Sequence, residues 1–239
     1  MQHPFDRRDF ISISAASLAP LLFGACDSEG PKKAEKLLGY AERKNEGVER
    51  AIFSHKSMDR VKANAVVAGD QFPSYFVSDI VPIWDTKMNG MWRLEVGGMV
   101  RKPLSLSLKD LMDIERHTQR VNHYCVEGWT AVAEWTGVPL SSLATMAEAD
   151  TQSRYVDFQS FDDDYHESWD IESALHPQTI VAYAKDGAPL SPAYGAPARL
   201  HSPVKLGYKN TKYLTKVVFM PERNGGYWSD RGYEWYGGV

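Results

Sequence analysis

The chain has 239 residues, of which 43% are hydrophobic and 24% are charged, a length and composition typical of one globular domain with a tail. The formal net charge is -4, and no basic run is interleaved with aromatic residues, so we expect no nucleic-acid partner.

Residues 1–26 have the pattern of an export signal. Arg7 and Arg8 precede a modestly apolar run at residues 12–24 that is too short to span a bilayer, and together these features resemble a twin-arginine signal. That route carries folded proteins, so a fragile cofactor can be loaded before export. The residues just before Cys26 resemble a bacterial lipobox, which predicts a lipid anchor at Cys26; cleavage of an ordinary signal nearby is the alternative. We expect a periplasmic or other extracytoplasmic location.

The next segment, residues 27–62, is rich in Lys, Glu, Gly and Ser, with scattered apolar residues. This composition predicts a charged tether, with a helix around residues 34–44, rather than a domain. The packed domain is expected at residues 63–239.

The first elements of this domain alternate between strand and helix patterns. Residues 92–96 alternate apolar and polar side chains before two glycines, which predicts a strand that ends in a turn or bulge. Residues 107–115 open with a Ser-x-x-Asp capping pattern, which predicts a helix. The next predicted strand covers residues 119–125.

The later elements follow the same periodicities. In chain order we expect a turn at residues 137–139, a short helix at 139–146, a strand at 155–160, a helical turn at 171–175, a strand at 179–184, a tight turn at 186–187, and strands at 198–201 and 213–219. The irregular order predicts a mixed α+β fold rather than a regular βαβ series.

Cys125 is the cysteine of the predicted domain, and the other one, Cys26, falls in the signal. An intramolecular disulfide is therefore not expected. Isolated cysteines are usually small buried side chains, but Cys125 follows a strand and precedes Gly128 and Trp129, in a turn where a thiolate could bind a metal. Zinc is disfavoured because the seven histidines show no compact ligand spacing with Cys125.

Four short motifs follow one another at residues 92–98, 125–140, 195–200 and 207–212. In this order they resemble the molybdopterin domain of the sulfite oxidase family, over most of the chain from residue 72 onward. The bacterial branch that includes the periplasmic methionine-sulfoxide reductase catalytic subunit is especially similar. The resemblance implies an α+β, mixed-sheet sulfite oxidase-type fold that binds Mo-molybdopterin.

The resemblance also implies roles for individual residues. Cys125 matches the cysteine that ligates molybdenum, and Tyr183 matches an active-site tyrosine that could hydrogen-bond the transferred oxygen. Arg199 and Lys212 match positions that contact the phosphate of the cofactor. The matching cofactor-binding positions are Ser160, Tyr194, Arg199, Asn210, Thr211 and Lys212. Without the motifs these residues would be interpreted as a core tyrosine, a strand-end serine and solvated charges.

The sequence departs from the family pattern near the start of the domain. Sulfite oxidases carry an arginine and a histidine after a Phe-Phe-x element, but Ser78 and Asp79 follow Tyr75-Phe76-Val77 here. Loss of the arginine weakens the attraction for a small dianion such as sulfite. Tyr194 also stands where the reductase branch has asparagine, and His201 replaces an aliphatic residue.

These features predict an exported molybdenum-dependent oxidoreductase that transfers an oxygen atom to or from a small molecule, such as a sulfoxide. Because the chain has no Cys-x-x-Cys-His haem motif, electrons are expected from a separate partner, either a membrane cytochrome or quinone-linked subunit or a soluble cytochrome c. Three alternatives remain: a sulfite dehydrogenase-like enzyme, a thiol hydrolase using Cys125 with His123 or His201 as base, and a cofactor-free binding lipoprotein.

Overall fold

The computed structural model describes residues 32–53, 57–62, 65–162 and 164–239. The predicted signal and the lipobox at Cys26 lie outside these residues. The chain divides into two compact units, Met1–Val48 and Glu49–Val239. Helix α2 (Lys32–Ile52) is longer than the helix predicted around residues 34–44. Among the described residues, none of the helices combines the length and the apolar character needed to cross a membrane.

The larger unit includes residues before the expected domain start at residue 63. The Asp59 carboxylate accepts hydrogen bonds from the Asn122 backbone N–H at 2.9 Å and the Tyr124 hydroxyl at 2.8 Å, and the Asp59 N–H donates to the Gln178 side chain at 2.6 Å. These contacts attach the end of the predicted tether to the strand that leads to Cys125.

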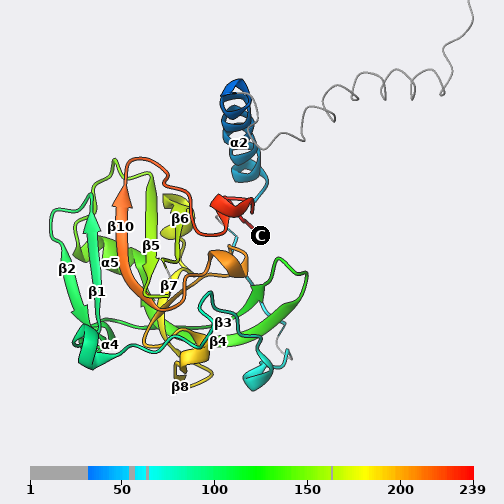
Figure 1. Cartoon of the computed structure of the whole chain (residues 1–239). Helices are drawn as coiled ribbons and strands as arrows, with labels where there is room; N and C mark the ends of the chain where they lie inside the picture. The colour runs from blue at the N-terminus through cyan, green and yellow to red at the C-terminus, as the bar shows by residue number, and fades with distance from the viewer. Residues whose placement is uncertain (1–31, 54–56, 63–64, 163) are drawn as a thin grey trace, which may run out of the picture. The chain divides into compact units, whose positions relative to one another are not determined.

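The first sheet of this unit has the strand order β2-β1-β10-β5-β6, and Figure 1 shows its strands side by side. The alternation predicted for β1 is confirmed, since Leu94 and Val96 are buried between exposed neighbours. β1 pairs with β10 in parallel, and the other pairs are antiparallel. The strands are β1 (Arg93–Gly98), β2 (Leu104–Ser107), β5 (Tyr155–Ser160), β6 (His166–Asp170) and β10 (Leu214–Met220).

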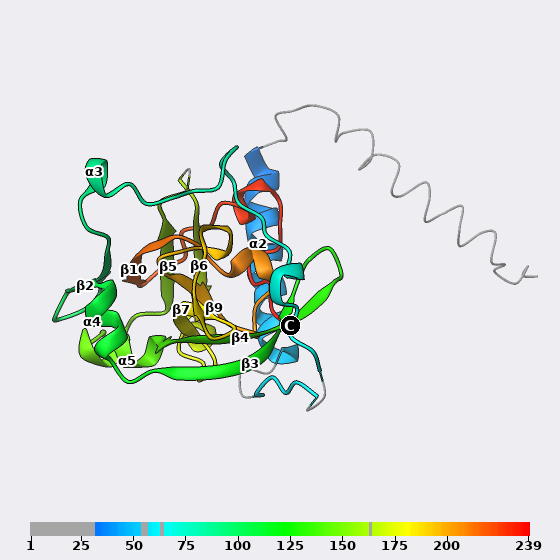
Figure 2. The same ribbon diagram turned by 90° about the horizontal axis from the view of Figure 1, so that it is seen from below.

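The second sheet has the order β3-β4-β7-β8, and β9 pairs with β7. Its strands are β3 (His117–Tyr124), β4 (Thr130–Pro139), β7 (Ile180–Lys185), β8 (Ala188–Pro189) and β9 (Arg199–His201). β3 and β4 form a long antiparallel hairpin that ends with Tyr124 opposite Thr130, and Figure 2 shows the two strands running together along one edge of the unit. The hairpin places Cys125 in its connecting turn.

The turn predicted at residues 137–139 is wrong, because these residues belong to β4. Val138 is fully buried, and Gly137 lies opposite Ala182 of β7. A Cβ atom at Gly137 would come within 2.1 Å of the Val181 carbonyl oxygen. The glycine is therefore explained by close approach of two strands rather than by a turn.

The short helices α4 (Leu108–Asp113), α5 (Leu140–Met146) and α6 (Ile171–Ala174) each follow one sheet and lead into the other, whereas α3 (Thr86–Asn89) precedes β1. Helix α4 begins with the predicted capping box, in which Ser107 and Asp110 bond each other's backbone N–H. The 3-10 turns lie at Gly69–Gln71, Pro192–Tyr194, Gly207–Lys209 and Ser229–Arg231. The mixed α+β architecture predicted from the sequence is confirmed.

Candidate functional site

A cavity of about 340 Å³ lies beside the turn that carries Cys125. Its walls come from residues 72–77, the β3–β4 turn, the end of β5, the 207–213 segment and the C-terminal residues Trp228 and Tyr233. Five of the predicted site residues line it: Cys125, Ser160, Arg199, Asn210 and Lys212. The fold therefore brings together residues that are far apart in the sequence.

The backbone of the β3–β4 turn fixes the position of Cys125. Its N–H donates to the Trp129 carbonyl at 2.9 Å, and its carbonyl accepts from the Gly128 N–H at 3.0 Å. Gly128 has a φ of 87°, a conformation that glycine adopts without steric cost. Cys125 is a free, partly buried thiol at the cavity, and burial raises its pKa.

Glu127 connects the thiol to two aromatic side chains. Its carboxylate oxygen lies 3.9 Å from the Cys125 sulfur and accepts hydrogen bonds from the Trp129 indole at 3.0 Å and the Tyr75 hydroxyl at 3.1 Å. The bond from Trp129 is the main cause that lowers the pKa of Glu127. Glu127 lies in the 125–140 motif, but the sequence alone suggested no role for it.

Two cations, Arg199 and Lys212, lie at another wall of the cavity. Arg199 is almost fully buried and donates at 3.2 Å to the backbone oxygens of Leu200, Tyr194 and Asn210. Burial lowers the pKa of Arg199 to about 10. These partners are neutral, and the guanidinium also lies 4.9 Å from the centroid of the Trp135 ring. No carboxylate neutralises its charge among the described contacts.

Lys212 adds a second charge beside Arg199. Its ammonium donates to the backbone oxygens of Tyr75 at 2.5 Å and Ala193 at 2.8 Å. Burial, followed by repulsion from Arg199, lowers the pKa of Lys212 to about 7. In the part of the chain that the structure describes, neither Arg199 nor Lys212 forms an ion pair with a carboxylate. This wall therefore suits an anionic group such as a phosphate.

Three predicted site residues do not line the cavity. Tyr183 on β7 is packed in the main hydrophobic core, so the structure does not place it next to Cys125. Tyr194 donates from its hydroxyl to the Phe72 carbonyl at 3.1 Å and accepts a bond from Arg199 with its own carbonyl, which supports Arg199 from behind. Thr211 is fully buried, and its carbonyl accepts a hydrogen bond from the Leu200 N–H of β9 at 2.8 Å.

Asp162 is a cavity residue that sequence reasoning missed. Its buried carboxylate accepts hydrogen bonds from the backbone N–H groups of Val77 at 2.9 Å and Ser78 at 3.0 Å, and from the Ser78 hydroxyl. These bonds hold the 72–78 segment against the cavity. Ser78, the position noted for its missing arginine, was the sequence signal that could have drawn attention to this contact.

The arrangement does not favour a thiol hydrolase. Nδ1 of His123 lies 3.4 Å from Nε2 of His201, and His201 stacks on Trp135 with ring centroids 4.3 Å apart. Burial lowers the pKa of His123 to about 3 and that of His201 well below its ordinary value. Among the described contacts neither imidazole bonds Cys125, and a thiol of raised pKa is not an activated nucleophile.

The donors at the cavity suit a metal that is carried by a larger anionic cofactor. Among the described residues, no three His, Cys, Asp or Glu side chains come together as a metal site, so the protein offers Cys125 as a single soft ligand. The hydroxyl of Tyr213, a cavity residue, is buried without a hydrogen-bond partner in the described structure. A bound group with polar atoms would satisfy it.

Comparisons with known proteins identify a matching family and several similar relatives. The family model described as "Oxidoreductase molybdopterin binding domain" matches residues 80–228. A putative protein-methionine-sulfoxide reductase subunit YedZ1 from Azospira oryzae is 34% identical over 233 residues, which cover 97% of this chain and 87% of that protein.

Shorter matches involve catalytic subunits and a solved structure. The protein-methionine-sulfoxide reductase catalytic subunit MsrP of Xanthomonas axonopodis pv. citri is 34% identical over 58% of this chain and 48% of its own length, so the match spans about half of that relative. The sulfane dehydrogenase SoxCD of Paracoccus pantotrophus has a similar fold, with a TM-score of 0.54 and 23% identity over 59% of this chain and 40% of that one.

Proposed function

Because this chain belongs to the oxidoreductase molybdopterin-binding domain family, we propose that it is a sulfoxide reductase that uses Mo-molybdopterin bound in the cavity beside Cys125. The proposal includes methionine sulfoxide as a substrate, since the names of two relatives refer to that activity. The observation that carries it is the free thiol of Cys125 in the same cavity as two cations, Arg199 and Lys212, that lack carboxylate partners within the described structure.

The cavity residues fit the proposed cofactor in chemistry and charge. Cys125 would be the protein ligand of the metal, because thiolates suit soft metals that change oxidation state. Arg199 and Lys212 would hold the phosphate. Ser160 and Asn210 line the same cavity. The Ser160 hydroxyl, which accepts the Asp162 N–H at 2.9 Å, would donate to a polar atom of the pterin. The Asn210 carboxamide is bonded to the backbone of Ser202, Lys205 and Leu206 and would hold the cavity wall in place. The bound cofactor would supply a centre that exchanges two electrons and an oxygen atom.

The residues around Cys125 would handle protons and the apolar part of the substrate. Conversion of a sulfoxide to a thioether and water consumes two electrons and two protons. The Tyr75 hydroxyl donates to Glu127 beside the thiol. Because its pKa is lowered, Glu127 would act as an ionised acceptor that orients this hydroxyl, and Tyr75 would relay protons from solvent to the departing oxygen. The ring of Trp129, stacked on Tyr75 with centroids 6.5 Å apart, would contact the carbon groups of the substrate.

A neutral sulfoxide fits the cavity better than sulfite does. The position expected to carry an arginine is Ser78, which bonds the Asp162 carboxylate. Asp162 itself lines the cavity, and a carboxylate there repels a small dianion. The Asp162 carboxylate would therefore repel sulfite but not a neutral sulfoxide, which disfavours the sulfite dehydrogenase-like alternative.

We further propose that the enzyme is exported and receives electrons from a separate membrane cytochrome or quinone-linked subunit. The paired Arg7 and Arg8, the apolar run after them and the lipobox-like residues before Cys26 support export. The relative from Azospira oryzae is named as a subunit, which supports a partner. A lipid at Cys26 would keep the enzyme near such a partner.

The proposed function can be tested on protein purified from a host that makes the cofactor and exports the chain. We expect about one molybdenum per chain, in line with one soft protein ligand, and oxidation of reduced viologen dye by methionine sulfoxide. Sulfite with ferricyanide should give far lower turnover. Absence of molybdenum after maturation would instead support a cofactor-free binding lipoprotein, and rapid sulfite oxidation would support the sulfite dehydrogenase-like alternative.

A further inference from the structure

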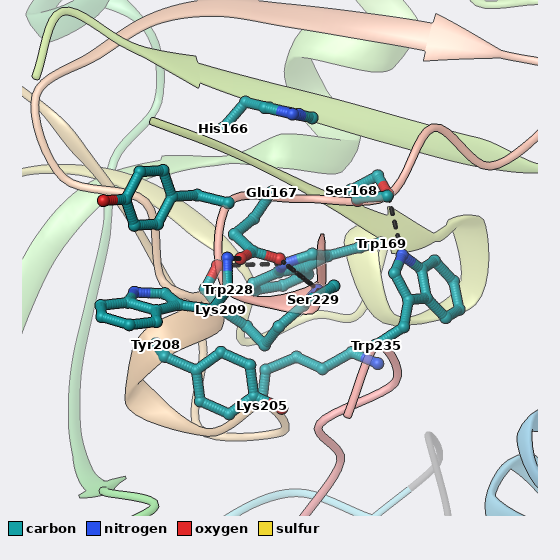
Figure 3. Close-up of polar contacts among 12 residues, drawn as sticks. His166, Glu167, Ser168, Trp169, Lys205, Tyr208, Lys209, Trp228, Ser229 and Trp235 are labelled. Carbon is teal, nitrogen blue, oxygen red and sulfur yellow. Dashed lines mark hydrogen bonds and ion pairs between the residues drawn. The ribbon is translucent and has the colours of Figure 1, made fainter. Parts of the chain in front are cut away.

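One buried carboxylate joins the two segments that form the aromatic wall of the cavity. Glu167 on β6 is fully buried, and one of its oxygens accepts a bond from the Lys209 ammonium at 2.5 Å. The Ser229 hydroxyl approaches the same oxygen at 3.4 Å. The other carboxylate oxygen accepts the Trp228 backbone N–H at 3.0 Å. Figure 3 shows Lys209, Trp228 and Ser229 converging on this carboxylate.

The two segments that Glu167 bonds contribute side chains to the cavity. Tyr208, next to Lys209, lines it together with Trp228 and Tyr233. Tyr233 contacts both of the other rings, with centroids 5.4 Å from Tyr208 and 5.0 Å from Trp228. These three side chains form one continuous surface, which we name the aromatic wall. Its two parts come from the 207–209 turn and the C-terminal segment, and Glu167 bonds both.

The backbone around Glu167 brings the C-terminal segment close to its carboxylate. Gly226 pairs with Glu167 in an isolated antiparallel bridge, and a Cβ atom there would lie 2.3 Å from a Glu167 carboxylate oxygen. The neighbouring N–H of Tyr227 donates to the His166 carbonyl at 2.8 Å. The C-terminal segment thus crosses β6 directly over the carboxylate, and any larger residue at Gly226 would displace it.

From these contacts we infer that Glu167 is a positioning residue for substrate recognition: it fixes the aromatic wall against which the carbon groups next to the sulfoxide pack. The inference rests on the proposed function and deepens it, because it names substrates with an apolar group beside the sulfoxide. Aromatic rings offer such groups a large, rigid contact area, and small displacements of positioning groups change binding geometry strongly.

The same strand supplies a matched control. Asp170, also on β6, is fully buried and pairs with the buried Lys205 at 2.8 Å. Lys205 also donates to the Tyr236 carbonyl at 2.7 Å. Asp170, Lys205 and Tyr236 do not line the cavity. Loss of this pair therefore removes a buried ion pair of the same kind without releasing the aromatic wall.

The test compares Glu167→Gln with Asp170→Asn in the cofactor-loaded full chain. A glutamine has one acceptor oxygen, so it can hold Lys209 or the Trp228 N–H but not both. With a methionine-sulfoxide peptide and reduced viologen, Glu167→Gln should raise KM about 10-fold and change kcat less than about 3-fold, with unchanged molybdenum content. Dimethyl sulfoxide, which has only methyl groups, should show less than about a 3-fold rise in KM. Asp170→Asn should leave both KM values unchanged.

A second readout is independent of turnover, so that it remains decisive if the proposed function fails. Trypsin should cleave after the exposed Arg231 about 10-fold faster in Glu167→Gln than in Asp170→Asn, because local release exposes the segment. Equal cleavage rates, equal KM changes in the two variants, or loss of molybdenum in Glu167→Gln alone would overturn the inference. If Glu167→Gln does not fold, the double variant Glu167→Met/Lys209→Met removes both charges of the pair, with Asp170→Asn/Lys205→Met as its control. The same comparisons of KM, molybdenum content and trypsin cleavage then test the inference.

Discussion

Replacement of Lys212 by methionine should remove the cofactor while leaving the fold intact. The change keeps the side-chain length and removes the charge. The shift of the Lys212 pKa from 10.5 to about 7 corresponds to at most ~5 kcal/mol against the charged form, at ~1.36 kcal/mol per pKa unit. Because the side chain is partly exposed, solvent screening reduces this cost to about 1–2 kcal/mol.

Loss of the Lys212 hydrogen bonds offsets the stability gained by removing its buried charge. Lys212 donates to the carbonyls of Tyr75 and Ala193, and each bond contributes about 1 kcal/mol. We therefore expect the free energy of unfolding of the cofactor-free chain to change by less than about 1 kcal/mol in Lys212→Met, as the sum of these opposing effects. The molybdenum content should fall about 10-fold or more, since the phosphate loses a charged donor.

The pH dependence gives an independent check. Since the folded pKa of Lys212 lies near 7 and the ordinary value is 10.5, the unfolded chain binds more protons than the folded chain between these two pH values. The stability contributed by this group therefore rises with pH across that window. The rise should be present in the cofactor-free wild type and absent in Lys212→Met.

Metal analysis and urea unfolding measure these effects. Lys212→Arg keeps the charge and should retain molybdenum. Lys216→Met removes a half-exposed lysine of β10 that lies 3.5 Å from Glu95, and it should change neither quantity. A wild-type molybdenum content in Lys212→Met, or a loss of several kcal/mol of stability, would refute the assignment of Lys212 to the phosphate.

Three further predictions concern other parts of the molecule. Cys125→Ala should abolish sulfoxide reduction while circular dichroism remains that of wild type; turnover above about 1% of wild type would point to another ligand. Gly137→Ala should lower the free energy of unfolding by about 3 kcal/mol or more, because its Cβ would lie 2.1 Å from the Val181 carbonyl oxygen, and an unchanged urea midpoint would contradict the close strand contact. Ser78→Arg should strengthen inhibition by sulfite about 10-fold by offsetting the Asp162 charge, which inhibition kinetics would detect or disprove.

Local patterns in the sequence predicted several elements well. β5 matches the expected residues 155–160, and the capping box of α4 is formed by the two residues that signalled it. These signals depend on neighbours within a few residues, so they can be recognised from the sequence alone. Cys125, Arg199 and Lys212, which the sequence motifs singled out, line one cavity; their roles in cofactor binding stay predictions.

Other features depend on contacts between distant segments. Gly137 was interpreted as a turn residue because glycine is common in turns, but the residue opposite it in the sheet, Ala182, explains its identity. The sequence equally allowed Tyr183 to be a core or an active-site residue, and only the packing of β7 places it in the core. The contacts of Glu127 with Tyr75 and of Asp162 with Val77 join distant segments, so no local pattern reveals them.

The parallel pairing of β1 with β10 has a consequence for assembly. Glu95 lies beside Lys216, so the first sheet cannot close until most of the chain has been synthesised, and such distant pairing slows folding. Two residues of the aromatic wall, Trp228 and Tyr233, lie still later in the sequence. Cofactor insertion should therefore follow translation, with a nearly complete but open cavity as the acceptor.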